Sequence, residues 1–481
     1  MTDLIKYIKN EIVVSSGDAI DFCVKQYHIK VETARKRIER LPDDICKIKK
    51  ICRDGQSILY ARDNWNTDTY YERLIVVLKE NAIQHYTIVN ALRLHYGSIP
   101  LNNLASYSNS PVEKIKGHKL FETVIADLNN IRLIEKGNEQ YCIRGCDEVI
   151  DIKSKAINTI QNIVLQQFHE WARNTGFISY NLAKFHSVFS GYQFGMVAPS
   201  YIKSLTGKTL KKEGKPIPAF VIADVLLNKE ISKDDVDFFV RKIQNISMQK
   251  QLARFIPFLI IGSHDSEIYN VLKTNGIVVG NIDELFGTKY SETIYGIFNL
   301  MYNAGAILKK NPEQYLKLLS EIEKIASGIT YNLKGDLFEM AVGYFHAQLC
   351  QNLDISKNII YDGEKKEIDV YAVYQEKVVF AECKGLNSPI DDEYIETWLS
   401  KKIPHFRKWA LQCDSLQNKR VVFEIWCTGG FSDISREKLA KAKQNTHKYD
   451  IDLFDIAEMK VIAKEKNIPH FKEILDRYYV N

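Results

Sequence analysis

Two short segments in the last third of the chain carry acidic and basic side chains at a spacing suited to hydrolytic chemistry. Residues 367–373 (EIDVYAV) and 378–384 (VVFAECK) both have the apolar character of strands, with a turn-length segment between them. Alternate residues of a strand share one face. Pairing of these strands as a hairpin would therefore place Asp369 beside Glu382, with Lys384 roughly 6.6 Å further along the same face.

Two neighbouring carboxylates repel each other and raise each other's pKa unless a cation lies between them. Oxygen ligands of this kind favour Mg²⁺, or Mn²⁺ in its place, and such an ion can polarise a phosphoryl oxygen and activate water. The backbone carbonyl of Cys383 lies between the two side chains in sequence and is a further candidate ligand. We expect Lys384 to favour hydroxide and to help neutralise charge that develops at phosphorus.

A third carboxylate precedes these strands by about thirty residues. Glu339 lies near the start of a predicted helix that begins at Gly335, beside the apolar stripe of that helix. Glu367 has the same strand parity as Asp369, and we expect it to be either exposed or an auxiliary ligand. The competing interpretation of the strand residues is that they are ordinary surface charges on a hairpin.

The order of Glu339, Asp369 and the run Glu382-Cys-Lys384-Gly385 resembles the PD-(D/E)XK restriction-endonuclease-like superfamily, most nearly its Mrr-like branch, over roughly residues 330–461. The resemblance implies phosphodiester hydrolysis that leaves a 5′-phosphate. It implies Asp369 and Glu382 as metal ligands, Lys384 as the base that stabilises hydroxide, and Glu339 as an outer or second-metal carboxylate. Ile368 stands where the family name has proline, a variation that is common in the superfamily.

The amino-terminal segment has the pattern of two helices followed by a strand, at 16–25, 31–41 and 57–62. Residues at helical spacing in the second helix form an expected buried stripe of Val31, Ala34, Ile38 and Leu41. The cations outside this stripe are Arg35, Lys36, Arg37 and Arg40. This order resembles a winged helix-turn-helix module, which implies contact with double-stranded DNA. The alternative is a solvated basic helix packed on a neighbouring domain.

The rest of the chain predicts a multidomain α+β and α/β protein. A second winged-helix module is expected at 67–150, with a hairpin turn at Gly137-Asn138, although it could serve only to hold domains together. Strands and helices then alternate over 151–290, a helical linker covers 291–329, and the nuclease-like lobe covers 330–481, after a winged module at 1–66. The middle lobe resembles a degenerate copy of the last one, in which the run that begins at Phe258 parallels the run that begins at Phe423 and Leu226 replaces the lysine of the Glu-x-Lys pattern.

Composition restricts the class of protein further. The 481 residues are 45% hydrophobic and 26% charged, which excludes a disordered chain. Lys and Arg total 65 against 60 Asp and Glu, and most of the excess falls in the first 62 residues. Nine cysteines without a disulfide pattern suit a reducing compartment. With no apolar run of membrane-spanning length, we expect a cytoplasmic protein without a membrane partner.

These features together predict a Mg²⁺-dependent DNA endonuclease. The resemblance places it in restriction or anti-phage defence, with a methyltransferase or an ATPase as a candidate partner. A single site cuts one strand, so cleavage of both strands favours a homodimer. The alternative is a DNA-binding regulator, or a structural subunit of a larger complex, in which the nuclease-like lobes are inactive.

Overall fold

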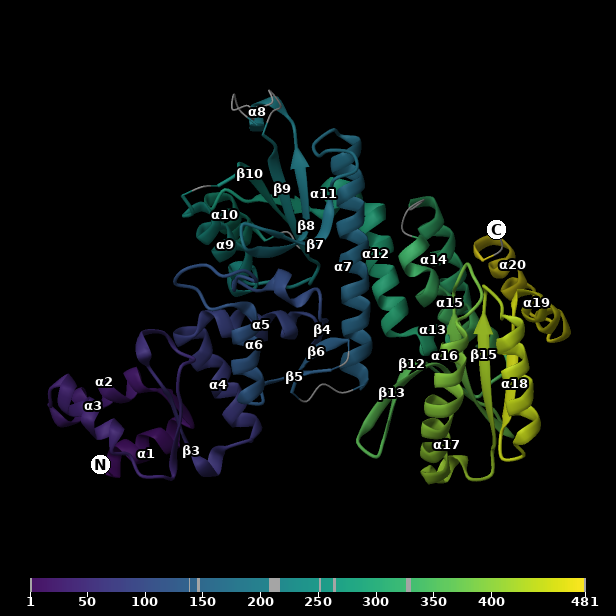
Figure 1. Ribbon diagram of the computed structural model, residues 1–481, viewed down its shortest axis with the longest axis horizontal. Helices are drawn as coiled ribbons and strands as arrows, with labels where there is room; N and C mark the ends of the chain where they lie inside the picture. Colours follow the sequence, from purple (N-terminus) through teal and green to yellow (C-terminus); the bar gives the residue numbers. More distant parts are fainter. Residues whose placement is uncertain are drawn as a thin grey trace. The chain divides into compact units, whose positions relative to one another are not determined.

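Helices and mixed β-sheets alternate along the chain in the computed structural model shown in Figure 1. The structure describes residues 2–137, 139–144, 148–206, 217–250, 252–262, 265–325 and 330–479. The chain divides into two units, Met1–Gly287 and Thr288–Asn481. Within the described ranges, no helix combines the length and the apolar character that a membrane crossing requires.

Unit 1 opens with three helices around a small antiparallel sheet of order β1-β3-β2. Its elements are α1 (Thr2–Glu11), β1 (Val13–Ser15), α2 (Ser16–Tyr27), α3 (Val31–Glu39), β2 (Ile45–Ile48) and β3 (Ile58–Ala61). Ser15 forms a capping box with Asp18 at the start of α2. Both predicted helices and the predicted strand are confirmed.

One member of the predicted buried stripe is wrong. Ala34, Ile38 and Leu41 are buried in the small core around α1 and β3, as expected. Val31 is 42% exposed. It is the first residue of α3, so no preceding turn of the helix covers its side chain.

The next segment of unit 1 has helices and a second small sheet of order β4-β6-β5. Its elements are α4 (Asp68–Asn81), α5 (Ile83–Leu94), β4 (Ser98–Pro100), η3 (Leu104–Tyr107), α6 (Phe121–Asn130), β5 (Ile134–Lys136) and β6 (Gln140–Ile143). The predicted hairpin is present, because β5 and β6 pair antiparallel and the Gly137 amide donates to the Gln140 carbonyl over 2.8 Å. Asn138 of the predicted turn lies outside the described residues.

A five-stranded mixed sheet completes unit 1. The elements are α7 (Glu148–Asn174), β7 (Lys184–Phe189), β8 (Tyr192–Ser200), α8 (Lys203–Thr206), β9 (Ala219–Leu226), α9 (Lys233–Ser247), β10 (Phe255–Ile261), α10 (Ser266–Thr274), β11 (Val278–Asn281) and α11 (Ile282–Phe286). The strand order is β11-β10-β9-β8-β7. Strands β7, β8 and β9 pair antiparallel, and β9, β10 and β11 pair parallel.

Unit 2 contains a second five-stranded sheet, of order β12-β13-β14-β15-β16. The helices before it are α12 (Thr288–Tyr302), α13 (Ala304–Lys310), α14 (Pro312–Ile325) and α15 (Thr330–Ala347). The strands are β12 (Asn352–Tyr361), β13 (Glu364–Val373), β14 (Lys377–Lys384), β15 (Arg420–Cys427) and β16 (Asp450–Phe454). The remaining helices are α16 (Asp392–Thr397), a π-helix η4 (Trp398–Lys402), α17 (Ile403–Gln412), α18 (Asp433–Asn445), α19 (Ile456–Glu465) and α20 (Pro469–Tyr478).

Both faces of the unit 2 sheet are covered. Phe380 of β14 stacks on Phe406 of α17 on one face. Phe345 of α15 packs against Trp426 of β15 and Phe471 of α20 on the other. The predicted helical linker is packed into this unit, since Gly305 of α13 lies so close to the Leu353 backbone that a Cβ atom would clash.

The two five-stranded sheets have the same plan. In each, the first three strands pair antiparallel and the last three pair parallel. The antiparallel ladder of the central strand stops at Met196↔Ala223 in unit 1 and at Val370↔Ala381 in unit 2. Beyond these last pairs, Asp224 on the central strand of unit 1 is equivalent to Glu382 in unit 2, and Gly195 on the neighbouring strand is equivalent to Asp369. Two residues further along the central strand, Leu226 is equivalent to Lys384.

A buried ion pair lies at the end of the ladder in unit 1. Lys242 of α9 and Asp224 of β9 are 0% and 1% exposed, with Nζ 2.8 Å from Oδ2. Lys242 also donates to the Ser106 and Gln193 carbonyls over 2.6 and 2.9 Å. Burial raises the pKa of Asp224 to about 6, although Lys242 opposes the shift. The pair thus joins η3, β8 and β9 through one ammonium group.

Replacing Lys242 by methionine tests how much unit 1 depends on this pair. The Asp224 carboxylate would be left buried without its cation, so we expect a loss of about 3–5 kcal/mol in the free energy of unfolding. Denaturant unfolding followed by circular dichroism measures this loss. The double variant Asp224→Leu with Lys242→Met is the control and should recover part of it. A loss below about 1 kcal/mol for the single variant would contradict the assigned role.

Candidate active site

Three of the four side chains predicted to do chemistry meet where β13 and β14 stop pairing. Asp369 and Glu382 are the residues that follow the last pair, Val370↔Ala381. Lys384 Nζ lies 2.9 Å from Glu382 Oε1 and 3.9 Å from Asp369 Oδ2. Asp369 is 7% exposed and Glu382 is fully buried. The hairpin predicted from strand parity therefore brings these three groups together.

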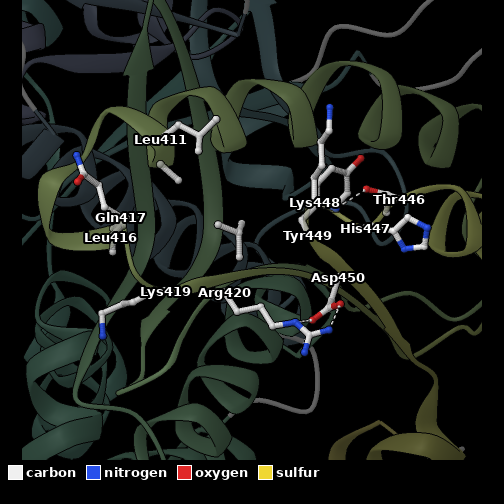
Figure 2. Close-up of a pocket in the computed structure, with 12 residues that line it drawn as sticks. Leu411, Leu416, Gln417, Lys419, Arg420, Thr446, His447, Lys448, Tyr449 and Asp450 are labelled. Carbon is white, nitrogen blue, oxygen red and sulfur yellow. Dashed lines mark hydrogen bonds and ion pairs between the residues drawn. The ribbon is translucent and has the colours of Figure 1, made fainter.

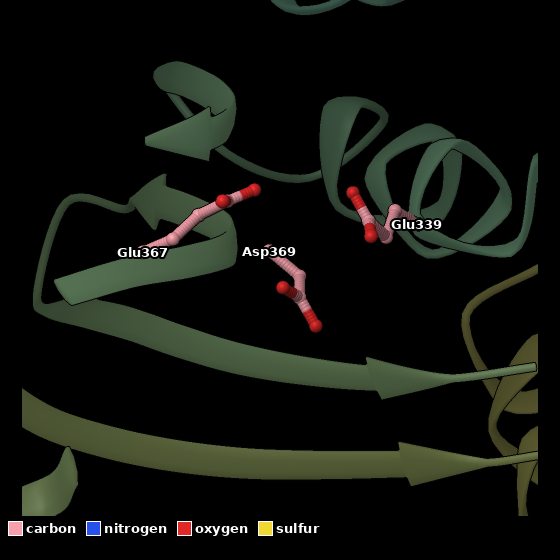
Figure 3. A group of neighbouring side chains, drawn as sticks. All are labelled: Glu339, Glu367 and Asp369. Carbon is pink, nitrogen blue, oxygen red and sulfur yellow. The ribbon is translucent and has the colours of Figure 1, made fainter. Parts of the chain in front are cut away.

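Glu339, the fourth predicted residue, joins this centre from helix α15. Glu339, Glu367 and Asp369 each offer a carboxylate oxygen, and these oxygens lie within 4.8 Å of one another. Figure 3 shows Glu339 extending from the helix toward the strand that carries Glu367 and Asp369. Ser356 Oγ donates to Glu339 Oε2 over 2.8 Å. Of the two interpretations of Glu367, the structure favours a place within the acidic group, since this residue is half-buried there.

Cys383 contributes its backbone to the centre. Its amide donates to Asp369 Oδ2 over 2.7 Å, which fixes one oxygen of that carboxylate. Burial raises the pKa of the Cys383 thiol well above its usual value, and the nearby carboxylates act in the same direction. The thiol is therefore neutral at physiological pH. The role predicted for its carbonyl as a metal ligand stays a prediction.

Two further residues contact Glu382 and were missed by sequence reasoning. Lys402 Nζ donates to both Glu382 oxygens, over 2.8 and 2.9 Å. Tyr394 Oη donates to Glu382 Oε1, and its ring centroid lies 4.9 Å from Lys384 Nζ. The only sequence signal was the mixture of cations and aromatic residues that begins at Trp398.

The helices around Lys402 explain why the residue was missed. The segment 398–409 packs on the sheet, because Trp398, Ile403 and Phe406 are buried in the core. The π-helix η4 ends at Lys402. Its wider turn changes which residues share a face, so regular α-helical spacing does not place Lys402 toward the sheet.

The charges of this centre shift one another's pKa values. Burial, and then the Glu382 charge, raises the pKa of Asp369 to about 6. Burial would also raise the pKa of Glu382, but Lys384 and Lys402 outweigh it and hold that pKa below its usual value. For Lys384, burial would lower the pKa, but Asp369 and Glu382 outweigh it and raise that pKa. Glu382 is thus ionised and Lys384 is protonated at neutral pH.

The four predicted DNA-binding cations lie on or just after α3. Arg35, Lys36 and Arg40 are exposed. Arg37 is half-buried, with its guanidinium 4.6 Å from the ring centroid of Tyr27. The structure therefore leaves three of these groups accessible to a phosphate backbone.

A separate cavity of about 400 Å³ lies elsewhere in unit 2 (Figure 2). The cavity lies at the start of β15 and β16, and Arg420 and Asp450, the first residues of these strands, are among the residues that line it. Arg420 pairs with Asp450, and Lys419 donates to the Tyr374 carbonyl over 2.6 Å. Lys384 pairs in register with Cys427, the last residue of β15, so the acidic centre lies at the opposite end of that strand.

No family model matches this chain, and no curated protein matches it. Among solved structures, restriction endonuclease FokI aligns over 56% of this chain and 58% of its own, with 12% identity and a TM-score of 0.19. The structure of FokI bound to DNA aligns over 56% and 57%, with 13% identity and a TM-score of 0.17. The alignments thus span less than two thirds of the FokI chain. Similarity at these TM-scores does not establish a shared fold.

The raised pKa of Asp369 gives a testable dependence of stability on pH. The Asp369 carboxyl group stays protonated up to about pH 6 in the native state, whereas in the unfolded chain it loses its proton at about pH 3.9. Stability therefore falls as pH rises between these two values, because the native state resists the ionisation of Asp369. Asp369→Asn removes that charge. In EDTA we expect the variant to exceed wild type in the free energy of unfolding by on the order of 1–3 kcal/mol at pH 8.

The same comparison at pH 4 is the control, because Asp369 is protonated in the native wild-type protein at that pH. The difference between the two proteins should then nearly disappear. Chemical denaturation at a series of pH values measures it. A difference that is the same at pH 4 and pH 8, or a less stable variant at pH 8, would contradict the assigned electrostatics.

Proposed function

We propose that the chain is a metal-dependent endonuclease that hydrolyses phosphodiester bonds of DNA. The observation that carries the proposal is the arrangement of Asp369 opposite Glu382, with the Lys384 ammonium group 2.9 Å from one carboxylate and 3.9 Å from the other. Buried carboxylates beside a lysine are costly to maintain in a fold. Such a group at a strand end is typical of a site that uses its charges.

The donor set fits a hard divalent cation. Asp369 would hold it together with Glu382, Glu339 and the Cys383 carbonyl, and Glu367 adds a further oxygen. Carboxylate and carbonyl oxygens are the ligands that Mg²⁺ and Mn²⁺ prefer. Bound there, the cation supplies Lewis-acid polarisation of a phosphoryl oxygen.

Lys384 provides positive charge beside the reacting phosphate. Its raised pKa keeps the amine protonated in the metal-free protein. Beside a bound phosphate, an ammonium group stabilises charge that develops at phosphorus. Glu382 holds this ammonium group in place through the 2.9 Å contact. The role of Lys384 as a base that stabilises hydroxide stays a prediction.

The remaining parts have supporting roles in this proposal. The first 66 residues act as a winged helix-turn-helix module whose helix α3 contacts double-stranded DNA through Arg35, Lys36, Arg37 and Arg40, and residues 67–150 form a second such module. The middle lobe is a degenerate nuclease-like copy, because Gly195 and Leu226 stand where Asp369 and Lys384 stand in unit 2. It supports the active lobe and does not cut.

The biological setting follows from the family resemblance and not from geometry. On that resemblance we expect a role in restriction or anti-phage defence, and on the cysteine usage we expect the protein in the cytoplasm. One active lobe per chain favours a homodimer for cleavage of both strands. A methyltransferase or an ATPase is the partner to look for beside it.

Nicking of supercoiled plasmid tests the proposed activity. With Mg²⁺, wild type should convert the plasmid to nicked and linear forms, and EDTA should stop this. We expect Asp369→Ala and Lys384→Ala each to lower the rate roughly 10²-fold or more, since each removes a charge aimed at the reacting group. Lys377→Ala, at the other end of β14, is the matched control and should cut at the wild-type rate.

Two results would overturn the proposal. Cutting that persists in both variants would remove the assigned site. No cutting by wild type on any DNA tested, together with tight DNA binding, would favour the alternative of a regulator or structural subunit with inactive lobes.

The salt dependence of DNA binding tests the role of α3. Arg35→Ala with Lys36→Ala removes two exposed candidate phosphate contacts, so the magnitude of the slope of log K against log salt should fall by roughly 2 for duplex DNA. Fluorescence anisotropy measures this slope. Lys464→Ala with Lys472→Ala, two exposed cations of the carboxyl-terminal helices, is the charge-matched control. An unchanged slope in the α3 variant would assign that helix to packing.

A further inference from the structure

Three side chains donate hydrogen bonds to the Glu382 carboxylate. Oε1 accepts from Lys384, Lys402 and Tyr394, and Oε2 accepts from Lys402. Lys402 thus contacts both oxygens, at 2.8 and 2.9 Å, from the helical segment that follows β14. Its side chain is 25% exposed, whereas that of Glu382 is fully buried.

A lysine from a helix also pairs with a strand carboxylate in the middle lobe, which lacks the counterparts of Asp369 and Lys384. Asp224 is the register equivalent of Glu382, and it pairs with Lys242 at 2.8 Å. Lys242 comes from α9, the helix that follows β9, just as Lys402 comes from the helical segment that follows β14. The lysine and the carboxylate are 18 residues apart in one lobe and 20 in the other.

The comparison separates two kinds of lysine. The middle lobe lacks a counterpart of Asp369, because Gly195 occupies that position and its amide donates to Asp224 Oδ1 over 2.5 Å. It also lacks a counterpart of Lys384, because Leu226 occupies that position. The lysine from the helix persists without either group. Its pairing with the strand carboxylate therefore does not depend on the metal ligand or on the strand lysine.

Charge gives the helix lysine a second effect in unit 2. Lys402 adds one positive charge to a centre that contains several carboxylates, so it lowers the attraction of this centre for a cation. In the middle lobe Lys242 is paired with a single carboxylate, Asp224.

We propose that Lys402 is a positioning residue that orients Glu382 and lowers the negative charge of the centre, while Lys384 is the lysine that faces the reacting phosphate. This inference rests on the proposed function. It assigns the two lysines that contact Glu382 to different tasks, and it makes the middle lobe an internal example of the helix lysine without catalysis.

Mn²⁺ binding and cleavage, measured on the full chain, test the proposal. Lys402→Met removes one positive charge from the centre, so Mn²⁺ should bind at least fivefold more tightly in isothermal titration. Its kcat for plasmid nicking should fall at least tenfold, with KM for DNA within threefold of wild type, because Glu382 loses its orientation. A purely structural role predicts the opposite change in affinity, a weaker Mn²⁺ site in a less stable protein.

Two further variants complete the design. Lys402→Arg keeps the charge and can contact both Glu382 oxygens, so it should restore Mn²⁺ affinity and kcat to within threefold of wild type. Asp224→Leu with Lys242→Met removes the equivalent pair in the middle lobe and should leave Mn²⁺ affinity unchanged. The arginine variant keeps the test decisive if the methionine variant unfolds, because a tenfold loss of kcat in Lys402→Arg would contradict the proposal.

The outcomes distinguish this inference from the proposed function. If wild type binds no Mn²⁺, or if Asp369→Ala cuts like wild type, the nuclease proposal fails. If wild type binds Mn²⁺ and depends on Asp369, but Lys402→Met binds Mn²⁺ no more tightly and cuts at the wild-type rate, the assignment of Lys402 fails and the nuclease proposal stands.

Discussion

A buried carboxylate on the central strand of a sheet must be balanced by a cation, and this constraint organises both large lobes of the chain. An isolated charge in a low-dielectric interior is too costly to keep, so each lobe supplies a lysine from the helical segment that follows the strand. Asp224 with Lys242, and Glu382 with Lys402, are the two solutions. The sheets around them share strand order and direction.

The difference between the lobes lies in what surrounds that pair. In unit 2 the position beside the carboxylate holds Asp369, and the strand adds Lys384 two residues further on. Burial, and then the Glu382 charge, raises the pKa of Asp369 to about 6. In the middle lobe a glycine and a leucine stand at the positions of Asp369 and Lys384. A centre with several carboxylates is suited to capture a cation, whereas a single carboxylate paired with one lysine holds the fold together.

Much of this centre could be predicted from the sequence, because strand parity and a short hairpin are local properties. Asp369, Glu382 and Lys384 fall on matching faces of neighbouring strands, and these patterns need no tertiary information. Lys402 could not be predicted in this way, because a π-helical turn decides which face it shares. Glu367 remained ambiguous, because its partner Glu339 comes from a helix distant in sequence.

The repeated plan of the two lobes was predicted, and so was the match of Leu226 with Lys384, but the match of strands β10 and β15 was wrong by one residue. Sequence comparison matched Phe258 with Phe423, since each is a phenylalanine that begins an apolar run. The strand register instead matches Phe258 with Glu424, because these residues pair with Ala223 and Ala381. Apolar runs specify a buried strand without fixing its register, which depends on pairing with its neighbours.

Diffraction from crystals soaked in Mn²⁺ tests the central claim most directly, because anomalous scattering locates the ion without reference to activity. The account predicts one peak per chain, roughly 2.1 Å from an Asp369 carboxylate oxygen, and none beside Asp224. A map with no peak at Asp369, or with a peak at Asp224, would contradict it.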